Sequence, residues 1–200
     1  MADQRSDGVL SSFLRRSRVA AAAPYLKGQV LDVGCGPGAL AALVDADRYV
    51  GMDIDEQSLD IARRKFPYHQ FNATLPTDAT FDTVVVLAVI EHVSDPVLFL
   101  KECGRRLRPG LDSRLICSTP HPRWGWAHNF GAWLGLFSRE AMREHKPLLD
   151  RRMIEIAAEG AGLRLLMYKR FLLGANQLAV FGRCDSVNVP GASKFGEIPG

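Results

Sequence analysis

Short apolar runs alternate with amphipathic segments along most of the chain. Apolar residues recur at helical spacing over residues 9–23, until Pro24 interrupts the pattern. Residues 29–33 form a β-branched run that ends at a glycine cluster, and residues 39–44 have the small side chains of a helix packed on a sheet. The pattern predicts an opening helix followed by a strand, a tight turn and a second helix.

The same order of elements repeats further along the chain. Residues 49–52 predict a second strand, and residues 57–66 predict a helix whose N-cap is Asp55. Phe71 marks a short third strand. Residues 83–87 are almost continuously apolar, as a strand buried on both faces requires. Strands that alternate with helices in this way indicate a parallel α/β sheet.

The next segment continues this alternation. Asp95 and Pro96 have the order of a helix cap and a first-turn proline, and the helix is expected to end at Pro109 and Gly110. Residues 114–118 then predict a fifth strand.

The end of the pattern predicts an antiparallel pair. A helix capped by Asp150 is expected over residues 151–161, followed by apolar runs at residues 163–171 and 177–181. Only a few residues around Gly174 join these two runs. They must run antiparallel, because a parallel crossover needs about a dozen residues.

Three segments fall outside this regular alternation. Residues 1–25 are interpreted as an N-terminal helix, and residues 183–200 as a mobile tail rich in Gly, Pro and Ser. Residues 119–149 are rich in Trp, His, Gly and Phe and are far longer than a connection of about 4 to 6 residues, so we interpret them as an insertion. The sequence therefore predicts one α/β domain over residues 1–182.

Composition and charge agree with a single globular domain. The chain has 200 residues, of which 47% are hydrophobic and 24% charged, which excludes collagen-like, disordered and disulfide-scaffold classes. The net charge of +3 is too small to indicate a nucleic-acid partner. Arg15, Arg16 and Arg18 are interpreted as a solvated helix face.

The apolar runs and the cysteines indicate in which cellular compartment the protein is found. The longest runs, residues 83–90 and 130–137, are less than half of the roughly 18 to 20 residues of a membrane-spanning helix. The N-terminus lacks the charged-then-apolar order of a signal peptide, and the 4 cysteines show no C-x-x-C spacing. We expect a cytoplasmic protein with free thiols and no membrane span.

A glycine-rich turn is the main candidate for a binding site. Gly34, Gly36 and Gly38 lie between a buried strand and a helix, where missing Cβ atoms let the backbone approach a nucleotide-like ligand. Asp53 follows the second strand, where a carboxylate can accept hydrogen bonds from ribose hydroxyls. Gly34-x-Gly36-x-x-Ala39 also fits the dinucleotide fingerprint, so a nicotinamide or flavin enzyme remains an alternative.

Additional motifs make the pattern more specific. The order LDVGCGPG, GMDID, FDTVVVLAVIEHVSDP, LRPG and LICSTP resembles the class I S-adenosylmethionine-dependent methyltransferases over residues 25–182. The resemblance implies a Rossmann-like, seven-stranded, mostly parallel sheet of order 3-2-1-4-5-7-6, with helices on both faces and strand 7 antiparallel. This implied ending agrees with the antiparallel pair inferred above from loop length.

The resemblance also implies S-adenosylmethionine as the cofactor and assigns residues to it. The glycine turn would meet its methionine and ribose side, Asp53 its ribose hydroxyls, and Met52 or Ile54 its adenine. Asn72 stands where relatives often have Asp, and its amide oxygen can accept the same hydrogen bond from the adenine amino group. The assigned residues are Asp32, Gly34, Gly36, Gly38, Asp53, Ile54, Asn72, Ala73 and, at the sulfonium end, Leu87.

Candidate catalytic groups are histidines. His92 follows Glu91 after the fourth strand and is either a base or part of a structural hydrogen bond that shapes the loop. His121 and His128 lie in the insertion and can supply a polar contact or a base for the acceptor. Some quinone O-methyltransferases hold a divalent metal at Glu-x-x-Glu-His, but Ala88 takes the first of these positions, so no metal is expected.

The insertion also contains aromatic side chains. Trp124, Trp126 and Phe130 are expected to wall a pocket for the methyl acceptor, with a satellite core beside the opening helix as the alternative.

The leading functional hypothesis is methyl transfer to the oxygen or nitrogen of a small-molecule acceptor. Alternatives are a cofactor-binding partner or scaffold subunit without catalysis of its own, and a nicotinamide-dependent oxidoreductase. The identity of the acceptor and the oligomeric state are open.

Overall fold

A seven-stranded sheet forms the centre of the molecule. The computed structural model describes residues 9–122 and 149–184. The strand order is β3-β2-β1-β4-β5-β7-β6, and β7 runs antiparallel to both of its neighbours. The predicted order and the antiparallel ending are confirmed. The strands are β1 (Val30–Val33), β2 (Tyr49–Met52), β3 (Gln70–Asn72), β4 (Thr83–Leu87), β5 (Arg114–Pro120), β6 (Leu163–Phe171) and β7 (Asn176–Arg183).

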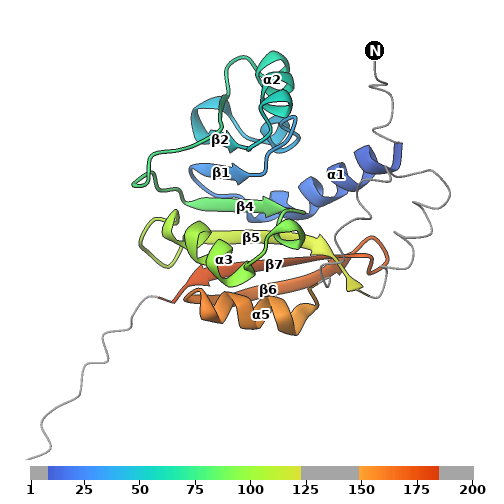
Figure 1. Cartoon of the computed structure of the whole chain (residues 1–200), viewed down its shortest axis with the longest axis vertical. Helices are drawn as coiled ribbons and strands as arrows, with labels where there is room; N and C mark the ends of the chain where they lie inside the picture. Colours follow the sequence, from blue (N-terminus) through green and yellow to red (C-terminus); the bar gives the residue numbers. More distant parts are fainter. Residues whose placement is uncertain (1–8, 123–148, 185–200) are drawn as a thin grey trace, which may run out of the picture.

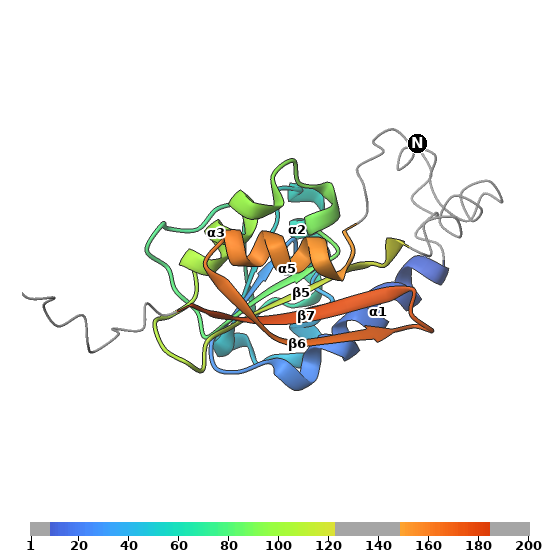
Figure 2. The ribbon, with the colours of Figure 1, turned by 90° about the horizontal axis from the view of Figure 1, so that it is seen from below.

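Helices cover both faces of this sheet, as Figures 1 and 2 show. Helices α3 (Pro96–Arg105) and α5 (Arg151–Gly160) pack on one face, and Leu100 and Ile154 belong to the apolar core there. Helices α1 (Val9–Ala22) and α2 (Glu56–Lys65) pack on the other, where the core contains Val19 and Leu59. Two apolar layers therefore enclose the central strands, which explains their continuous apolar runs.

Aspartates begin three of the helices, as the sequence predicts. Asp55 accepts hydrogen bonds from the backbone N–H groups of Gln57 and Ser58 at the start of α2. Asp95 caps α3, and Asp150 caps α5 in the same way. Each carboxylate satisfies N–H groups that have no partner within the helix.

Two predicted helices differ from the observed structure. The helix expected at residues 39–44 is wrong, because only a 3-10 turn, Leu40–Leu43, fits between the glycine turn and the extended Val44. Helix α3 ends at Arg105 rather than near Pro109, because Leu107 leaves the helix to form a parallel bridge with Phe81. Leu107 is fully buried there.

Two segment boundaries also move. Thr119 and Pro120 belong to β5, so the expected insertion begins later than residue 119. Arg183 is the last residue of β7 and is not part of the tail. Residues 123–148 and 185–200, with the aromatic acceptor wall and the tail expected there, lie outside the described residues.

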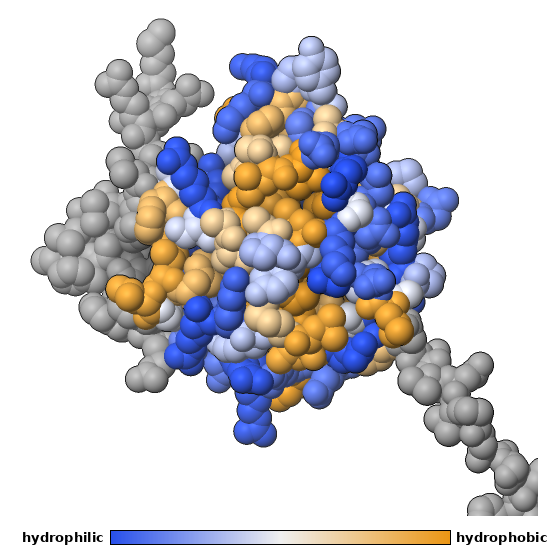
Figure 3. Space-filling view, turned by 180° about the vertical axis from the view of Figure 1, so that it is seen from behind, coloured by the Kyte–Doolittle hydropathy of each residue, from blue (hydrophilic) through white to orange (hydrophobic). Residues whose placement is uncertain are grey.

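The outer surface is mixed in polarity. Figure 3 shows the face that carries α1, where apolar side chains gather between hydrophilic ones. Phe13 and Leu43 are each 54% exposed. Within residues 9–122 and 149–184, no helix has the length and apolar character needed to cross a bilayer.

Candidate functional site

The carboxyl ends of β1, β2 and β4 meet at one edge of the sheet. Val33 pairs with Met52 on one side and with Val86 on the other, so the loops that follow these strands are neighbours. Open α/β sheets bind ligands at this edge. The glycine turn follows β1 here.

Backbone hydrogen bonds hold the glycine turn against β2. The N–H groups of Gly34 and Cys35 both donate to the carbonyl oxygen of Met52, at 2.7 and 3.1 Å. Gly34 has a φ of +72°, and a Cβ at this position would overlap Cγ2 of Val89. Glycine is therefore required at Gly34 both by the backbone conformation and by the loop after β4.

Asp53 closes the turn from the end of β2. Its Oδ2 accepts a 2.7 Å hydrogen bond from the N–H of Gly36, and its Oδ1 accepts one of 2.9 Å from the N–H of Asp55. A Cβ at Gly36 would meet no atom within 4 Å, so this part of the turn is open. Gly38 differs, because a Cβ there would lie 3.2 Å from the rings of Phe66 and Phe71.

A cavity of about 330 Å³ opens beside this turn. Four of the residues assigned by resemblance line it, from β1, the glycine turn and the end of β4. Helix α1 and the start of α2 supply further polar residues. The lining residues are Ser11, Arg15, Arg18, Val19, Asp32, Gly34, Cys35, Gly36, Pro37, Ala39, Leu40, Ser58, Leu87 and Ala88.

Two of the three arginines in α1 are not on the solvated face that the sequence suggested. Arg15 and Arg18 line the cavity, and Nε of Arg18 donates a 3.1 Å hydrogen bond to Oδ1 of Asn176 in β7. Burial lowers the pKa of Arg18. Only Arg16 is exposed, so the expected solvated face is wrong for its two neighbours. The sequence did contain a signal for this arrangement. The spacing of four and three residues places Ser11, Arg15 and Arg18 on one face of the helix.

Asp32 is the buried acid of the site. It is 3% exposed, and its Oδ2 accepts a 2.8 Å hydrogen bond from the hydroxyl of Tyr49. Burial raises the pKa of Asp32 to about 7, the Tyr49 hydrogen bond lowers it, and the nearby charge of Asp53 raises it. The carboxyl group is therefore partly protonated near pH 7.

Other residues assigned to the cofactor lie around the cavity rather than on its wall. Ile54 is 97% exposed beside Asp53, and Ala73 is also exposed. Asn72 is half-buried, and its carbonyl oxygen accepts a 3.3 Å hydrogen bond from the N–H of Asp53. Ile54 follows β2, and Asn72 and Ala73 stand at the end of the neighbouring β3, so the three residues lie at the carboxyl ends of adjacent strands.

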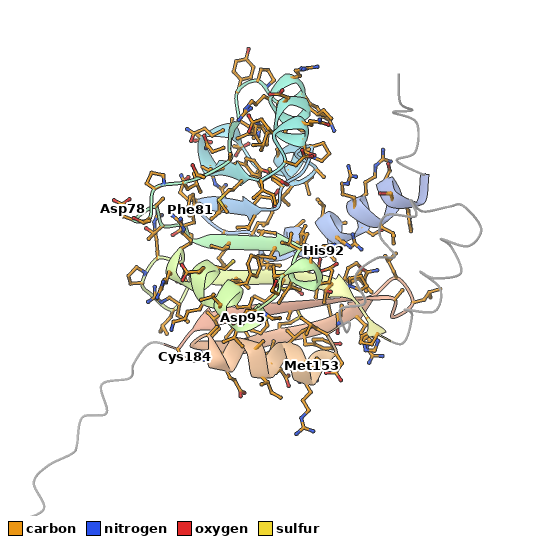
Figure 4. The ribbon with its side chains drawn as sticks, viewed as in Figure 1. Asp78, Phe81, His92, Asp95, Met153 and Cys184 are labelled. Atoms are coloured by element: carbon orange, nitrogen blue, oxygen red, sulfur yellow. The ribbon has the colours of Figure 1, made fainter. Side chains whose placement is uncertain are left out.

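Glu91 and His92 differ strongly in their surroundings. His92 is exposed and lies at the carboxyl end of β4, as Figure 4 shows. The Oε2 of Glu91 is buried and has no hydrogen-bond partner within the described part of the chain. Burial raises the pKa of Glu91, and the charges of Arg18 and His92 oppose that shift. Glu91 is thus the member of this pair that the fold encloses.

Of the other two candidate histidines, only His121 is among the described residues, and it does not line this cavity. His121 is buried and lines a second hollow of about 440 Å³ beside the start of α5, with Arg152 and Arg170. His128 lies outside the described residues. In the described ranges, no three His, Cys, Asp or Glu side chains are grouped closely enough to hold a metal ion.

The sheet order, the glycine turn, Asp32 near the end of β1 and Asp53 after β2 define an α/β domain of the class I methyltransferase type. A family model described as a methyltransferase domain matches residues 6–167. The chain belongs to this family.

Curated relatives match about half of the chain. A probable S-adenosylmethionine-dependent methyltransferase of Mycolicibacterium smegmatis is 41% identical over 99 residues, covering 46% of this chain and 38% of the relative. A ubiquinone biosynthesis O-methyltransferase of Idiomarina loihiensis is 39% identical over 94 residues, covering 41% of this chain and 39% of the relative. The matched region thus spans well under half the length of these relatives.

Solved structures share the fold over most of the chain. A magnesium protoporphyrin IX methyltransferase from Synechocystis, solved with bound S-adenosylhomocysteine, has a TM-score of 0.63 at 18% identity and covers 91% of this chain and 90% of its own. DesVI of Streptomyces venezuelae has a TM-score of 0.67 at 14% identity, covering 90% and 99%. At these identities the likeness concerns the fold.

Proposed function

We propose that this protein binds S-adenosylmethionine beside the glycine turn and transfers its methyl group to a small-molecule acceptor. The observation that carries this proposal is the cavity in which Gly34, Gly36 and the buried Asp32 meet at the carboxyl ends of the strands. Its volume of about 330 Å³ is within the range of small-molecule sites. Its wall combines apolar side chains with a few polar groups, as such sites do.

The residues around the cavity fit the parts of this cofactor. Asp32 offers a carboxylate to the ammonium of the methionine moiety, and Leu87 lies at the sulfonium end. Asp53 keeps unused lone pairs on both oxygens for the ribose hydroxyls. The exposed side chain of Ile54 would gain free energy by covering an adenine ring, since apolar burial is favourable. Asn72 and Ala73 would meet the adenine edge.

The chemistry requires mainly alignment by the protein. When bound, S-adenosylmethionine supplies a methyl group on a positively charged sulfur. The chain must hold the acceptor in line with that methyl and exclude water from both. For a hydroxyl acceptor, a base would also help, and His92 is the candidate because it follows β4, whose end at Leu87 and Ala88 lines the cavity.

Binding and turnover measurements test this function in two steps. Titration calorimetry with S-adenosylmethionine, S-adenosylhomocysteine and NAD is expected to show binding of the first two only. Turnover to S-adenosylhomocysteine is then measured against a library of hydroxyl and amine acceptors. NAD binding without a response to S-adenosylhomocysteine would favour an oxidoreductase. Cofactor binding without turnover on any acceptor would favour a partner or scaffold subunit.

A further inference from the structure

Tyr49 does not line the cavity, but its hydroxyl bonds to Asp32, which does. It is 1% exposed on β2, and its ring packs edge-on against His69 and Phe71 at centroid distances of 5.4 and 5.7 Å. Its hydroxyl donates to Oδ2 of Asp32 at 2.8 Å. The two strands are in register with Asp32 opposite Gly51, which is two residues from Tyr49 along β2, so the side chains of Tyr49 and Asp32 lie on the same face of the sheet.

The packed ring allows this hydroxyl little movement. Aromatic neighbours on two sides hold the ring in place, and the position of the ring determines the position of the hydroxyl oxygen. A buried tyrosine hydroxyl requires a partner, and a buried carboxylate requires donors. The hydrogen bond therefore occupies one oxygen of Asp32 and orients the carboxyl group on the cavity wall.

We propose that Tyr49 is a positioning residue for the cationic end of the ligand: it orients Asp32 and keeps its carboxylate available to an ammonium group. This inference rests on the proposed function, since the ammonium belongs to the methionine part of the cofactor. Tyr49 does not line the cavity, and its hydroxyl bonds to Asp32, which does, so it acts through that carboxylate.

The charges that face Asp32 come from several elements. Asp53, at the end of β2, raises the pKa of Asp32, in addition to the larger effect of burial. Arg15 and Arg18 from α1 line the same cavity, and so does the Cys35 thiol, whose pKa burial also raises.

Tyr49 supplies the hydrogen bond that favours ionisation of Asp32. This bond lowers the pKa of Asp32 against the effect of burial, which leaves it at about 7. A ligand with a positive charge favours the ionised carboxylate, so its binding near neutral pH displaces a proton.

The affinity for an ammonium-bearing ligand should depend on pH through the ionisation of Asp32. Below pH 7, the affinity for an ammonium-bearing ligand should rise by about tenfold per pH unit, because the ionised fraction of Asp32 rises in that proportion. Above the pKa of Asp32 the affinity should level off. Removal of the Tyr49 hydroxyl raises this pKa further, which moves the rise in affinity to higher pH.

The test compares two ligands and three proteins. S-adenosylhomocysteine carries the ammonium, and 5′-methylthioadenosine has the adenine, ribose and thioether without it. The proteins are the parent, Tyr49→Phe and the control Tyr168→Phe, which removes a hydroxyl that donates to Gln177 far from the glycine turn. Affinities are measured by calorimetry from pH 5.5 to 8.5.

At pH 6, Tyr49→Phe is expected to bind S-adenosylhomocysteine about tenfold or more weakly than the parent, since hydrogen bonds to charged groups have this magnitude. At pH 8.5 the difference should shrink to within about threefold, because Asp32 is then largely ionised in both proteins. Affinity for 5′-methylthioadenosine should show neither the pH dependence nor the loss. Tyr168→Phe should match the parent throughout.

A uniform loss at every pH, or an equal loss for both ligands, would show that Tyr49 only supports the fold. The parent protein provides a second measurement if Tyr49→Phe does not fold. Calorimetry in two buffers of different ionisation enthalpy should detect close to one proton released per S-adenosylhomocysteine bound at pH 6 and almost none at pH 8.5; no release at pH 6 would overturn the inference. If neither ligand binds at any pH, the proposed function itself fails.

Discussion

The N–H of Gly36 donates a 2.7 Å hydrogen bond to Oδ2 of Asp53, which ties the turn after β1 to the end of β2. The second oxygen of this carboxylate accepts from the N–H of Asp55, which itself caps α2. One side chain therefore shapes the glycine turn and the start of a helix at once. In the proposed function the same carboxylate also meets the ribose, so its loss should weaken ligand binding.

Replacing Asp53 by alanine should weaken S-adenosylhomocysteine binding by about 1 to 3 kcal/mol, or roughly 5- to 150-fold, the range for hydrogen bonds to a charged acceptor. Calorimetry measures the change. The control is Asp78→Ala, an exposed aspartate at the opposite end of the sheet in Figure 4, which should bind like the parent. If Asp53→Ala bound S-adenosylhomocysteine as tightly as the parent, Asp53 would not contact the cofactor.

Replacing Asp32 by asparagine should make the ligand-free protein more stable at pH 8. The pKa of Asp32 is about 7 in the folded chain, against an ordinary value of 3.8. Folding therefore favours the protonated carboxyl, and the parent loses stability as pH rises from about 4 to 7. An amide has no charge to lose and can still accept the Tyr49 hydrogen bond.

The stability difference between Asp32→Asn and the parent should reach about 2 to 4 kcal/mol at pH 8 and vanish below about pH 4. Urea unfolding at several pH values measures it. Asp78→Asn, an exposed change of the same chemistry, should keep the pH dependence of the parent. A constant difference across this range would contradict the raised pKa.

Gly51→Ala should destabilise the fold by about 1 to 3 kcal/mol, the usual cost of overpacking a core. A Cβ there would lie 2.7 Å from Cδ1 of Phe71 and 2.9 Å from Sγ of Cys35. Gly104→Ala is the control, because its Cβ would lie 3.4 Å from Leu163 in ordinary contact and alanine favours a helix. Denaturant midpoints should fall for the first variant and stay level or rise for the second.

Arg18→Ala should lower both stability and S-adenosylhomocysteine affinity, the latter by roughly tenfold. The substitution removes a guanidinium from the cavity wall, leaves Asn176 without its donor, and removes a positive charge that favours ionised Glu91. Arg16→Ala on the exposed side of the same helix should change neither quantity. If the two variants behaved alike, Arg18 would make no contribution at the cavity, and the α1 arginines would form only a solvated helix face.

The local sequence pattern predicted the seven strands and the glycine turn, although the helix expected over residues 39–44 is only a 3-10 turn. Continuous apolar runs marked β4 as a buried strand, and aspartates before helical segments marked the caps, because burial and capping act within a few neighbouring residues. Gly34 and Gly36 could be assigned to a ligand-binding turn because their spacing between a strand and a helix is itself the signal. The strand order required the additional resemblance of motifs, since local pattern does not specify which strands pair.

The tertiary structure alone decided which side chains meet at the site. Arg18 reaches the cavity because of the way α1 packs on the sheet, and charge alone did not distinguish it from the exposed Arg16. Tyr49 meets Asp32 because the register of two parallel strands brings residues 17 positions apart within 2.8 Å. Such contacts depend on long-range packing, and so does the early end of α3, where Leu107 pairs with Phe81. A local sequence pattern carries no information on which distant residues will come into contact.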